Sequence, residues 1–549
     1  MLSLDFLLGF TLLLGGRCVG ASPSARGFAP TVKLDNGTFT GVASGSVNKF
    51  LGIPFAQPPV GDLRFRLPQA NKPYTGVQTA TAFGPSCPQQ SFTLPIPGVL
   101  AQEAVDFLVN SIYDIVIPDS EDCLTINVVA PATASPASKL PVVAWIFGGG
   151  FEIGSTSTYD GGIIVERSIQ LGEPVVYVSM NYRLSAFGFL ASQEVKEAGV
   201  GNLGLQDQRQ ALRWIQKYIG AFGGDPTKVT IWGESAGAIS VAMHLLTNGG
   251  NTEGLFRAGF MQSGSPIPVG DISGGQPYYD ALVRGTGCSG SSDTLQCLRD
   301  APYASLKSAM DDTPGIFAYQ SLVLAWLPRA DGVFLTAPPQ QLVLQGSVAN
   351  VPIISGDCDD EGTLFSLSTL NVTTDQQLQD YLSQIYLPNA TTAEIEHLLE
   401  LYPEDITEGS PFDTGILNAL TPQFKRLAAL QGDVVFQAPR RFFLQQRSGK
   451  QNIWSFLSKR LKDIPGLGSF HGSDILNAYG DEDMADYIIR FAANLDPNGN
   501  TNINWPKYTT GSPNLLTFLD GLIPQTITQD TYREDGFNYL TQLSLAQPI

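Results

Sequence analysis

Residues 229–246 read VTIWGESAGAISVAMHLL and predict a β-strand, a sharp turn and an α-helix in direct succession. The apolar, β-branched run Val229–Trp232 is typical of a buried strand, and Ala238–Leu246 has the pattern of a helix. Between them, Gly233-Glu234-Ser235-Ala236-Gly237 matches the pattern G-x-S-x-G. Glycines on both sides permit a strained turn that lifts the serine hydroxyl clear of the backbone. The stretch therefore predicts a nucleophilic Ser235, with an ordinary glycine and serine turn as the alternative.

Further apolar runs predict more strands of the same sheet. Continuous β-branched runs of this length are typical of central strands that are buried on both faces. The expected strands are Thr125–Val129, Val142–Phe147, Pro174–Val178 and Pro352–Ser355. A helical pattern over Gly204–Ile219 places Leu205, Leu212, Ile215 and Ile219 on one side. Strands that alternate with helices predict a mainly parallel α/β sheet in a single domain over residues 22–549.

The chain offers few candidates for the base that a serine nucleophile needs, because it contains only three histidines. His244 lies inside the helix predicted after Ser235, from which it could not turn back to the serine. His397 lies in an amphipathic helical pattern, where a solvated position is expected. His471 lies late in the chain in the glycine-rich stretch GLGSFHGSD, and we expect it to be the base.

An acidic residue should orient this base, and it should follow a strand between Ser235 and His471. The expected strand Pro352–Ser355 leads into a loop that carries several carboxylates. The candidates are Asp357, Asp359, Asp360 and Glu361. Their spacing alone does not decide which of them orients the imidazole.

Backbone N–H groups near the serine could stabilise a developing negative charge on a substrate oxygen. One source is Ala236, directly after the serine, and the other is Gly148-Gly149-Gly150, at the end of the strand Val142–Phe147. Consecutive glycines let the backbone approach a substrate closely. A phosphate-binding loop is the alternative for this run, but no Gly-Lys-Ser/Thr sequence follows it.

The composition restricts the classes of partner. Lys and Arg number 32 against 51 Asp and Glu, which gives a net charge of −19 at pH 7. Such a surface repels phosphate backbones and anionic membranes, so we expect no nucleic-acid partner. Apolar residues make up 43% of the chain, which is enough for a large core. No cysteines have the CxxC spacing of a zinc site, and we expect neither a metal nor a cofactor.

The N-terminal residues predict export. Residues 2–14, LSLDFLLGFTLLL, form a short apolar run that is followed by small residues up to Ala21. A run this short predicts a secretory signal peptide over residues 1–21 rather than a membrane span, with a buried N-terminal helix as the alternative. No later apolar run reaches transmembrane length. Sequons at Asn36, Asn371 and Asn389 fit glycosylation of a secreted, extracellular protein.

The cysteines predict two disulfides and one free thiol. One cysteine would leave with the signal peptide, so that five remain, and an odd number leaves one unpaired. Cys288 and Cys297 lie nine residues apart in a stretch rich in glycine and serine, which suits a local disulfide. Cys87 and Cys123 then pair by elimination, and Cys358 stays reduced.

Several stretches of the chain resemble the type-B carboxylesterase/lipase family. The signature motifs are Phe222-Gly223-Gly224-Asp225-Pro226 through Gly237, and Ser120-Glu121-Asp122-Cys123-Leu124 through Val128. Further matches are Phe50–Ala56, Trp145–Phe151, Asn181–Arg183 and Asp360–Thr363. The resemblance covers essentially the whole mature chain, and within the family it is strongest to fungal secreted lipases and sterol esterases of the Candida rugosa lipase type.

This resemblance implies an α/β-hydrolase fold, with a large, mostly parallel central sheet flanked by helices and a disulfide-tethered lid. It also assigns roles to individual residues of the site. The implied roles are Ser235 as nucleophile, His471 as base, Glu361 as acid, the amides of Gly149, Gly150 and Ala236 as oxyanion donors, and Cys87–Cys123 and Cys288–Cys297 as disulfides. Cys358 has no role that the resemblance implies.

The implied lid is the loop between Cys87 and Cys123, approximately residues 88–122. Its middle is unusually apolar, and its polar residues recur at spacings of three and four, which places them on one face of a helix. These polar residues are Glu103, Asp106, Asn110 and Asp114. An amphipathic flap of this kind can cover a site in water and open at a lipid surface, whereas an ordinary packed surface helix is the alternative. We expect a monomer or a weak homodimer through this region.

Together these features predict an enzyme that cleaves long-chain acyl esters at an oil–water interface through an acyl-enzyme intermediate. The expected substrates are triacylglycerols, with steryl esters also accepted. The apolar segment 313–327, TPGIFAYQSLVLAWL, is expected to line the acyl pocket. One alternative is a general carboxylesterase for short, soluble esters. The other is a non-catalytic adhesion module on the same fold, which would be expected to lack the serine or the histidine.

Overall fold

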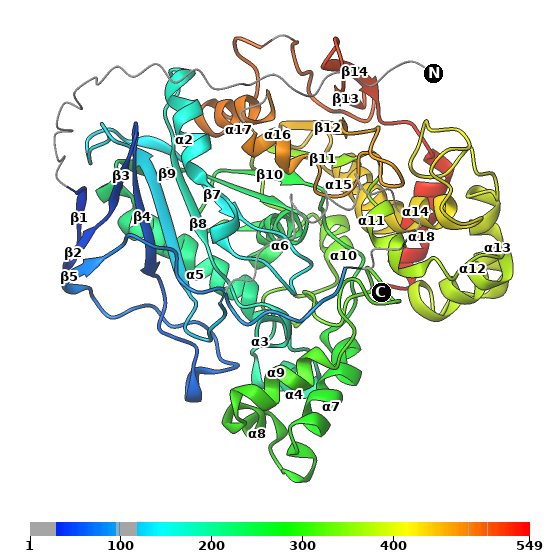
Figure 1. The fold of residues 1–549 in the computed structure, drawn as a ribbon, viewed down its shortest axis with the longest axis horizontal. Helices are drawn as coiled ribbons and strands as arrows, with labels where there is room; N and C mark the ends of the chain where they lie inside the picture. Colours follow the sequence, from blue (N-terminus) through cyan, green and yellow to red (C-terminus); the bar gives the residue numbers. More distant parts are fainter. Residues whose placement is uncertain (1–28, 95–97, 99–117, 481–482, 502, 549) are drawn as a thin grey trace, which may run out of the picture.

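A large mixed β-sheet crosses the middle of the molecule in the computed structural model, which describes residues 29–94, 98, 118–480, 483–501 and 503–548 (Figure 1). Within these residues, eleven strands form the sheet. From one edge to the other they are β3 (Val42–Ser44), β4 (Val47–Pro54), β6 (Thr125–Pro131), β8 (Val176–Met180), β7 (Leu140–Ile146), β9 (Gly224–Glu234), β10 (Ala258–Gln262), β11 (Ile353–Cys358), β12 (Ile453–Lys459), β13 (Asn514–Leu519) and β14 (Gln525–Gln529). The strands from β8 to β13 pair in parallel, and the pairs at the two edges are antiparallel.

The expected strands all lie in this sheet, as β6, β7, β8, β9 and β11. Every residue of β6, β8 and β11 is buried, which is why a continuous apolar run, rather than an alternating one, is their signal. Among the strands that were not predicted, β10 lies between β9 and β11, and β12 and β13 continue the parallel part of the sheet beyond β11. The prediction of a mostly parallel α/β fold is confirmed.

Helices cover both faces of the sheet (Figure 1). On one face α2 (Gly161–Gln170) and α17 (Asp483–Asn494) pack against the central strands and each other. On the other face α5 (Leu203–Tyr218) and α6 (Ala236–Gly250) pack against β9. The helix expected over Gly204–Ile219 is α5, and the apolar side predicted for it is buried. The sheet is therefore the middle layer of three.

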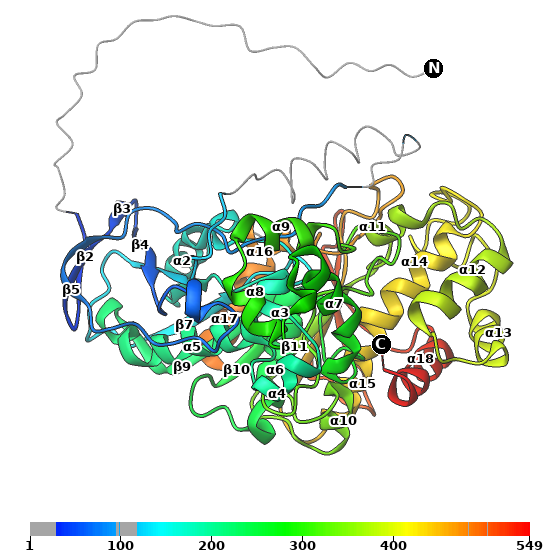
Figure 2. The same ribbon diagram turned by 90° about the horizontal axis from the view of Figure 1, so that it is seen from below.

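Smaller elements extend the molecule at both ends of the sheet. In both views the small sheet of β1 (Thr31–Leu34), β2 (Asn36–Thr40) and β5 (Thr75–Thr79) lies at one end, far from α12 (Asp375–Tyr381) and α13 (Thr392–Leu401) (Figures 1 and 2). In the part of the chain that the structure describes, the other α-helices are α3 (Ser185–Phe189), α4 (Gln193–Ala198), α7 (Gln276–Gly285), α8 (Thr294–Asp300), α9 (Tyr303–Asp311), α10 (Pro339–Leu344), α11 (Thr363–Ser366), α12 (Asp375–Tyr381), α13 (Thr392–Leu401), α14 (Phe424–Gly432), α15 (Ala438–Arg447), α16 (Ile475–Tyr479) and α18 (Glu534–Ala546). A π-helical turn, Asp433–Gln437, joins α14 to α15.

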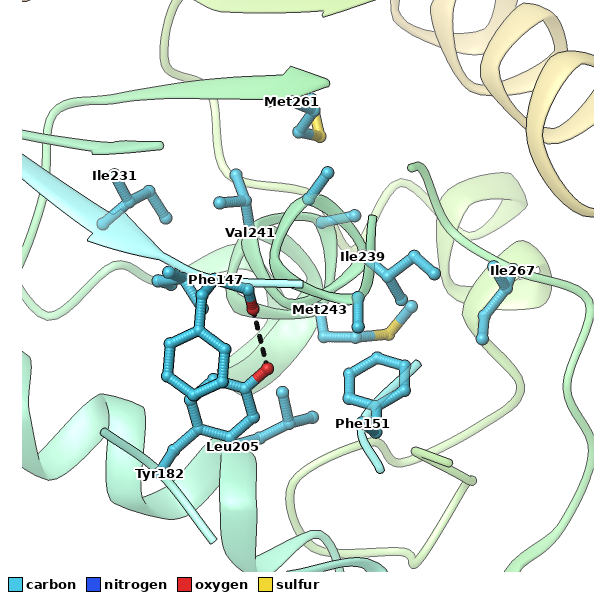
Figure 3. Close-up of a cluster of buried hydrophobic side chains, with 14 of the residues drawn as sticks. Phe147, Phe151, Tyr182, Leu205, Ile231, Ile239, Val241, Met243, Met261 and Ile267 are labelled. Carbon is cyan, nitrogen blue, oxygen red and sulfur yellow. Dashed lines mark hydrogen bonds between the residues drawn. The ribbon is translucent and has the colours of Figure 1, made fainter. Parts of the chain in front are cut away.

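A buried cluster holds the chain just before the glycine run Gly148-Gly149-Gly150 (Figure 3). The ring of Tyr182 stacks on Phe147 with centroids 4.5 Å apart, and its hydroxyl donates a 2.8 Å hydrogen bond to the Phe147 carbonyl oxygen. Ile239 and Met243 of α6 belong to the same cluster. Because protein interiors are close-packed, this core sets the position of the glycine run relative to α6.

Two predicted features lie outside the described residues. The first is the signal peptide over residues 1–21. The second is the middle of the predicted lid, because the polar and apolar positions between residues 99 and 117 are not among those that the structure describes. In the described part of the chain, no helix combines the length and the apolar character that a membrane crossing requires.

Candidate active site

Ser235 occupies a strained turn between β9, which ends at Glu234, and α6, which begins at Ala236. Its φ of 55° lies in the left-handed region, where residues with a side chain are uncommon. The flanking glycines make this turn possible. A Cβ on Gly233 would lie 2.4 Å from the Gly237 backbone, and one on Gly237 would lie 2.0 Å from the carbonyl oxygen of Ile146. The strand, turn and helix thus have the arrangement that the motif predicts.

The imidazole of His471 contacts both a hydroxyl and a carboxylate. His471 follows β12 through a long loop, and its Nε2 lies 2.8 Å from Ser235 Oγ. Its Nδ1 lies 2.5 Å from Oε2 of Glu361, which follows β11. The ring packs against Phe436, with centroids 4.5 Å apart, and against Phe365 at 5.1 Å. Three residues that are far apart in the sequence therefore form one hydrogen-bonded series.

Contacts distinguish the carboxylates that spacing left open. Glu361 faces the imidazole, and its Oε1 accepts a 2.6 Å hydrogen bond from the Cys358 N–H. Asp357 instead forms a 2.7 Å ion pair with Arg440. The other two candidates, Asp359 and Asp360, lie 2.5 Å and 2.6 Å from the ammonium of Lys462. Of the four carboxylates, Glu361 is the one that contacts His471.

Gln437, in the π-helical turn, holds the loop that carries Glu361. Its side-chain amide donates to the carbonyl oxygens of Cys358 and Asp359, each at 3.1 Å. Phe436, the preceding residue, packs on the His471 ring. This one turn therefore contacts both the loop that carries Glu361 and the imidazole of His471. Neither contact has a sequence signal, because a glutamine and a phenylalanine are ordinary in a buried helix.

The series is buried, and burial changes its protonation equilibria. Burial lowers the pKa of His471 to about 4, because the protonated ring would lose its hydration. The ring is therefore neutral at pH 7, and Nε2 can accept a proton. Burial also raises the pKa of Glu361, and the hydrogen bonds from the Ser263 side chain and the Cys358 N–H oppose this rise and favour the carboxylate. When His471 accepts a proton, the positive charge forms next to Glu361. The imidazolium and the carboxylate then stabilise each other.

Two more buried carboxylates surround the imidazole. Glu234 Oε1 lies 3.6 Å from His471 Nε2, and burial together with the charges of Asp474 and Glu361 raises the pKa of Glu234. Asp474 accepts a 2.9 Å hydrogen bond from the Gln262 side chain. The charge of Asp474 raises the pKa of His471 against the effect of burial. Glu234 directly precedes Ser235, and Asp474 is the third residue after His471. This proximity in the sequence is the signal that could have identified both carboxylates.

The glycine run approaches the serine closely. A Cβ on Gly148 would lie 2.8 Å from the Ser235 Cβ. Gly149 and Gly150 have φ values of 101° and 61°, and a Cβ on Gly149 would lie 2.3 Å from the Ile153 carbonyl oxygen. Ala236 begins α6, so its N–H belongs to the first turn of the helix, where amides have no intrahelical partner. The glycine run and the first amide of α6 thus both lie close to Ser235.

A cavity of about 90 Å³ opens above the serine. Its polar lining includes Ser235, His471 and the glycine run, and its apolar lining includes Ile316, Phe317 and Phe365. Two residues of the segment 313–327 thus line the cavity, as expected for an acyl pocket. The arrangement can transfer the serine proton to the imidazole and place an acyl group against apolar walls.

Glu152 connects the glycine run to this apolar segment. Its Oε2 accepts a 2.7 Å hydrogen bond from the Ile316 N–H, whereas its Oε1 has no hydrogen-bond partner among the described residues. Burial raises the pKa of Glu152 to about 8. The carboxyl group is therefore protonated at pH 7 and adds no charge beneath the cavity.

Replacing Glu152 with glutamine is expected to reduce the loss of stability between pH 5 and pH 8. The folded protein keeps the Glu152 proton up to about pH 8, whereas the unfolded chain releases it near pH 4.5. The folded state thus binds more protons in this window, and its stability falls as pH rises. In the wild type this lowers the free energy of unfolding by roughly 3–5 kcal/mol between pH 5 and pH 8, and Glu152→Gln should remove that decrease. Thermal melting of both proteins at pH 5, 6.5 and 8 measures the difference, and parallel curves would contradict it.

The remaining predicted positions have these places in the structure. Disulfides join Cys87 to Cys123 and Cys288 to Cys297, and Cys358 is a buried free thiol. The sequon residues Asn36, Asn371 and Asn389 are exposed. His244 is buried in α6, and its Nε2 lies 3.0 Å from Gln208 Oε1. His397 is exposed on α13, so neither of these histidines reaches the serine.

Comparison with known proteins finds similar chains over almost the whole length. The model of the carboxylesterase family matches residues 29–534. Lipase 2 of Diutina rugosa is 46% identical over 539 residues, which covers 95% of this chain and 98% of that protein. Secreted triacylglycerol lipase LIP1 of Gibberella zeae is 40% identical over 541 residues, which covers 95% and 92%. The crystal structure of Aspergillus niger EstA matches with a TM-score of 0.80 and 28% identity, over 95% of this chain and 99% of that one.

Proposed function

The chain belongs to the carboxylesterase family, and from this premise we propose that it hydrolyses long-chain acyl esters, triacylglycerols and steryl esters, through an acyl-enzyme on Ser235. Its family and its relatives named lipases identify it as a carboxylic ester hydrolase. The resemblance predicted from the motifs is thereby confirmed. The observation that carries the proposal is the hydrogen-bonded series of Ser235, His471 and Glu361 beside an apolar cavity.

Acylation begins when Ser235 Oγ attacks the ester carbonyl carbon. His471 Nε2, 2.8 Å away, accepts the hydroxyl proton as the Oγ–C bond forms. Glu361, 2.5 Å from Nδ1, keeps the Nδ1–H directed toward itself and stabilises the imidazolium. The electron pair of the carbonyl moves to its oxygen, which becomes an oxyanion. Donors that are already in place stabilise this charge without reorganisation.

The oxyanion donors in this mechanism are the backbone amides of Gly149, Gly150 and Ala236. The tetrahedral intermediate collapses when its bond to the alcohol oxygen breaks, and His471 returns the proton to that oxygen. The alcohol leaves as a neutral molecule, and the acyl group remains on Ser235. Water then attacks the acyl carbon with His471 again as base, which releases the carboxylic acid and restores the serine.

The preference for long acyl chains is supported by the cavity walls and by the relatives. Ile316, Phe317 and Phe365 offer apolar contacts to an alkyl chain. Two similar proteins are named secreted lipases or triacylglycerol lipases. In this proposal the substrate is a neutral lipid ester at an oil–water interface. The loop of approximately residues 88–122 acts as the lid that opens there.

One observation favours a second candidate, a carboxylesterase for short, soluble esters. The cavity of about 90 Å³ is well below the roughly 300–1,000 Å³ of typical ligand pockets. A small cavity would accept an acetyl or butyryl group without any movement. The two candidates share the same chemistry and differ in the size of the acyl group.

A substrate panel separates these candidates. The purified protein is expected to hydrolyse emulsified triolein and cholesteryl oleate as well as p-nitrophenyl acetate, because the proposed lid opens at an interface. Release of oleic acid, measured by titration, gives the rates, and the same panel with Ser235→Ala gives the background. Cleavage of the acetate alone would support the short-ester candidate and overturn the lipase proposal.

The proposal also concerns location and assembly. Residues 1–21 act as a signal peptide, and residues 22–549 form one secreted, extracellular domain. Support comes from relatives named secreted lipases and from the exposure of Asn36, Asn371 and Asn389 to glycosylation. The protein acts as a monomer or as a weak homodimer through the lid region, without a nucleic-acid partner.

A further inference from the structure

A second hollow of about 270 Å³ lies beside the active-site cavity. It is formed between α16 and the beginning of α2, two helices that contact each other. The two cavities have Thr158, Tyr159, Gly472 and Ile475 in common. Ile163 of α2 and Leu476 of α16 line the second hollow and do not line the first.

The floor of this second hollow is aromatic and well packed. Tyr479 stacks on the buried Trp232, with centroids 5.3 Å apart and planes at 18°. Its hydroxyl lies 2.9 Å from that of Tyr177, so its polar atom is engaged. Tyr159 packs against Tyr479 at 5.4 Å and against Trp145 at 5.0 Å. This rigid aromatic layer and the aliphatic walls make a surface for an apolar ligand.

One charged group borders the hollow, and it is already paired. Asp160 lies in the lining, and the ammonium of Lys49 is 2.7 Å from its Oδ1. The same oxygen accepts a 2.8 Å hydrogen bond from the Gly162 N–H as the cap of α2. A carboxylate that is neutralised in this way offers little attraction to a cationic ligand.

The second hollow lies on the side of the leaving group. His471 returns its proton to the alcohol oxygen, so the alcohol must lie next to Nε2. Gly472, directly after His471, and Ile475, four residues after it, line both cavities. Ile316, in contrast, belongs to the active-site cavity and lies against Gly150 of the glycine run. An alcohol that extends from the imidazole past Gly472 reaches the second hollow.

We propose that this second hollow, the alcohol-side hollow, binds the apolar alcohol portion of the ester, such as a long alkyl alcohol or an acylated glycerol arm. The inference rests on the proposed ester hydrolysis and adds a determinant of alcohol specificity. Ile163 and Leu476 contact the alcohol chain, and the aromatic layer around Tyr479 supports it. Short alcohols, such as methanol, end before the hollow and gain nothing from it.

Filling the hollow tests the proposal. Leu476→Trp is expected to lower kcat/KM for decyl octanoate at least tenfold relative to methyl octanoate, while kcat/KM for methyl octanoate stays within about twofold of wild type. The two esters share one acyl group and compete in one detergent solution, so that their ratio does not depend on the amount of active enzyme. Ile163→Phe fills the hollow from the opposite wall and should change the ratio in the same direction.

A matched control replaces Leu344, an exposed leucine of α10, with tryptophan, which should leave the ratio unchanged. Thermal melting shows whether each variant is folded, and Ile163→Phe serves if Leu476→Trp is not. An unchanged ratio in a folded filling variant would overturn the alcohol-side hollow, as would an equal fall for both esters. Failure of the wild type to hydrolyse either ester would instead overturn the proposed function.

Discussion

Ser235→Ala is expected to lower kcat for ester hydrolysis by about 10⁶-fold, because no other group can form the acyl-enzyme. The expected effect on stability is small. Serine and alanine both carry a Cβ, so the φ of 55° costs the same in either protein. Among the described residues, the hydrogen bond that is lost is the 2.8 Å one to His471 Nε2. The variant should therefore melt at the wild-type temperature while losing its activity.

The measurement is the initial rate on p-nitrophenyl acetate and on triolein, with melting curves alongside. Ser240→Ala is the matched control, because Ser240 lies in the following helix and bonds to the Ala236 carbonyl oxygen and to Gln208, not to the imidazole. It should keep the wild-type order of magnitude of kcat. Substantial ester hydrolysis by Ser235→Ala would remove the assignment of the nucleophile and with it the proposed mechanism.

Glu361→Gln is expected to lower kcat by about 10⁴-fold with little change in KM. The glutamine fits the same space, and its carbonyl oxygen can accept from the Cys358 N–H as Oε1 does now at 2.6 Å. Its NH₂ group would then face His471 Nδ1 and donate to it. The imidazole proton would move to Nε2, and Nε2 could no longer accept the proton of Ser235.

Asp359→Asn serves as the comparison. Asp359 lies in the same loop, two residues before Glu361, but its Oδ2 lies 2.5 Å from Lys462 Nζ. It should keep kcat within roughly tenfold of wild type, since no group in contact with the imidazole is changed. Steady-state rates at saturating ester give both values. Equal decreases in kcat for the two variants would show that activity depends on the net charge of the loop. They would contradict a specific role of Glu361 in orienting His471.

The strands were the most predictable part of the fold. Runs such as Thr125–Val129 and Pro174–Val178 are continuous and β-branched, and burial on both faces of a parallel sheet produces that signal. The boundaries were less predictable. β9 begins at Gly224, five residues before the apolar run, because Gly224 already pairs with Leu140 of β7, and an irregularity in the register separates this pair from the pair Val142–Val229.

The site was predictable where a local constraint leaves a mark on the sequence. The turn at Ser235 needs glycines on both sides, because a Cβ at Gly237 would lie 2.0 Å from the Ile146 carbonyl oxygen. His471 could be chosen because the other two histidines lie in helical patterns. Gln437 and Gln262 left no such mark, because side-chain amides are common and act here through partners that are distant in the sequence.

By itself the sequence determined the α/β class, the turn at Ser235 and the family, and it singled out His471 as the proposed base, because each depends on residues that are neighbours in the chain or on a motif. Only the tertiary structure shows which carboxylate contacts the imidazole of His471. The candidates were Asp357, Asp359, Asp360 and Glu361. These four lie within five positions of one another, yet one faces His471 and the others face cations. The direction of each side chain depends on where β11 ends and on what β12 and the π-helical turn place around it. Pairings between residues 83 to 110 positions apart in the sequence therefore distinguish Glu361 from the other three carboxylates.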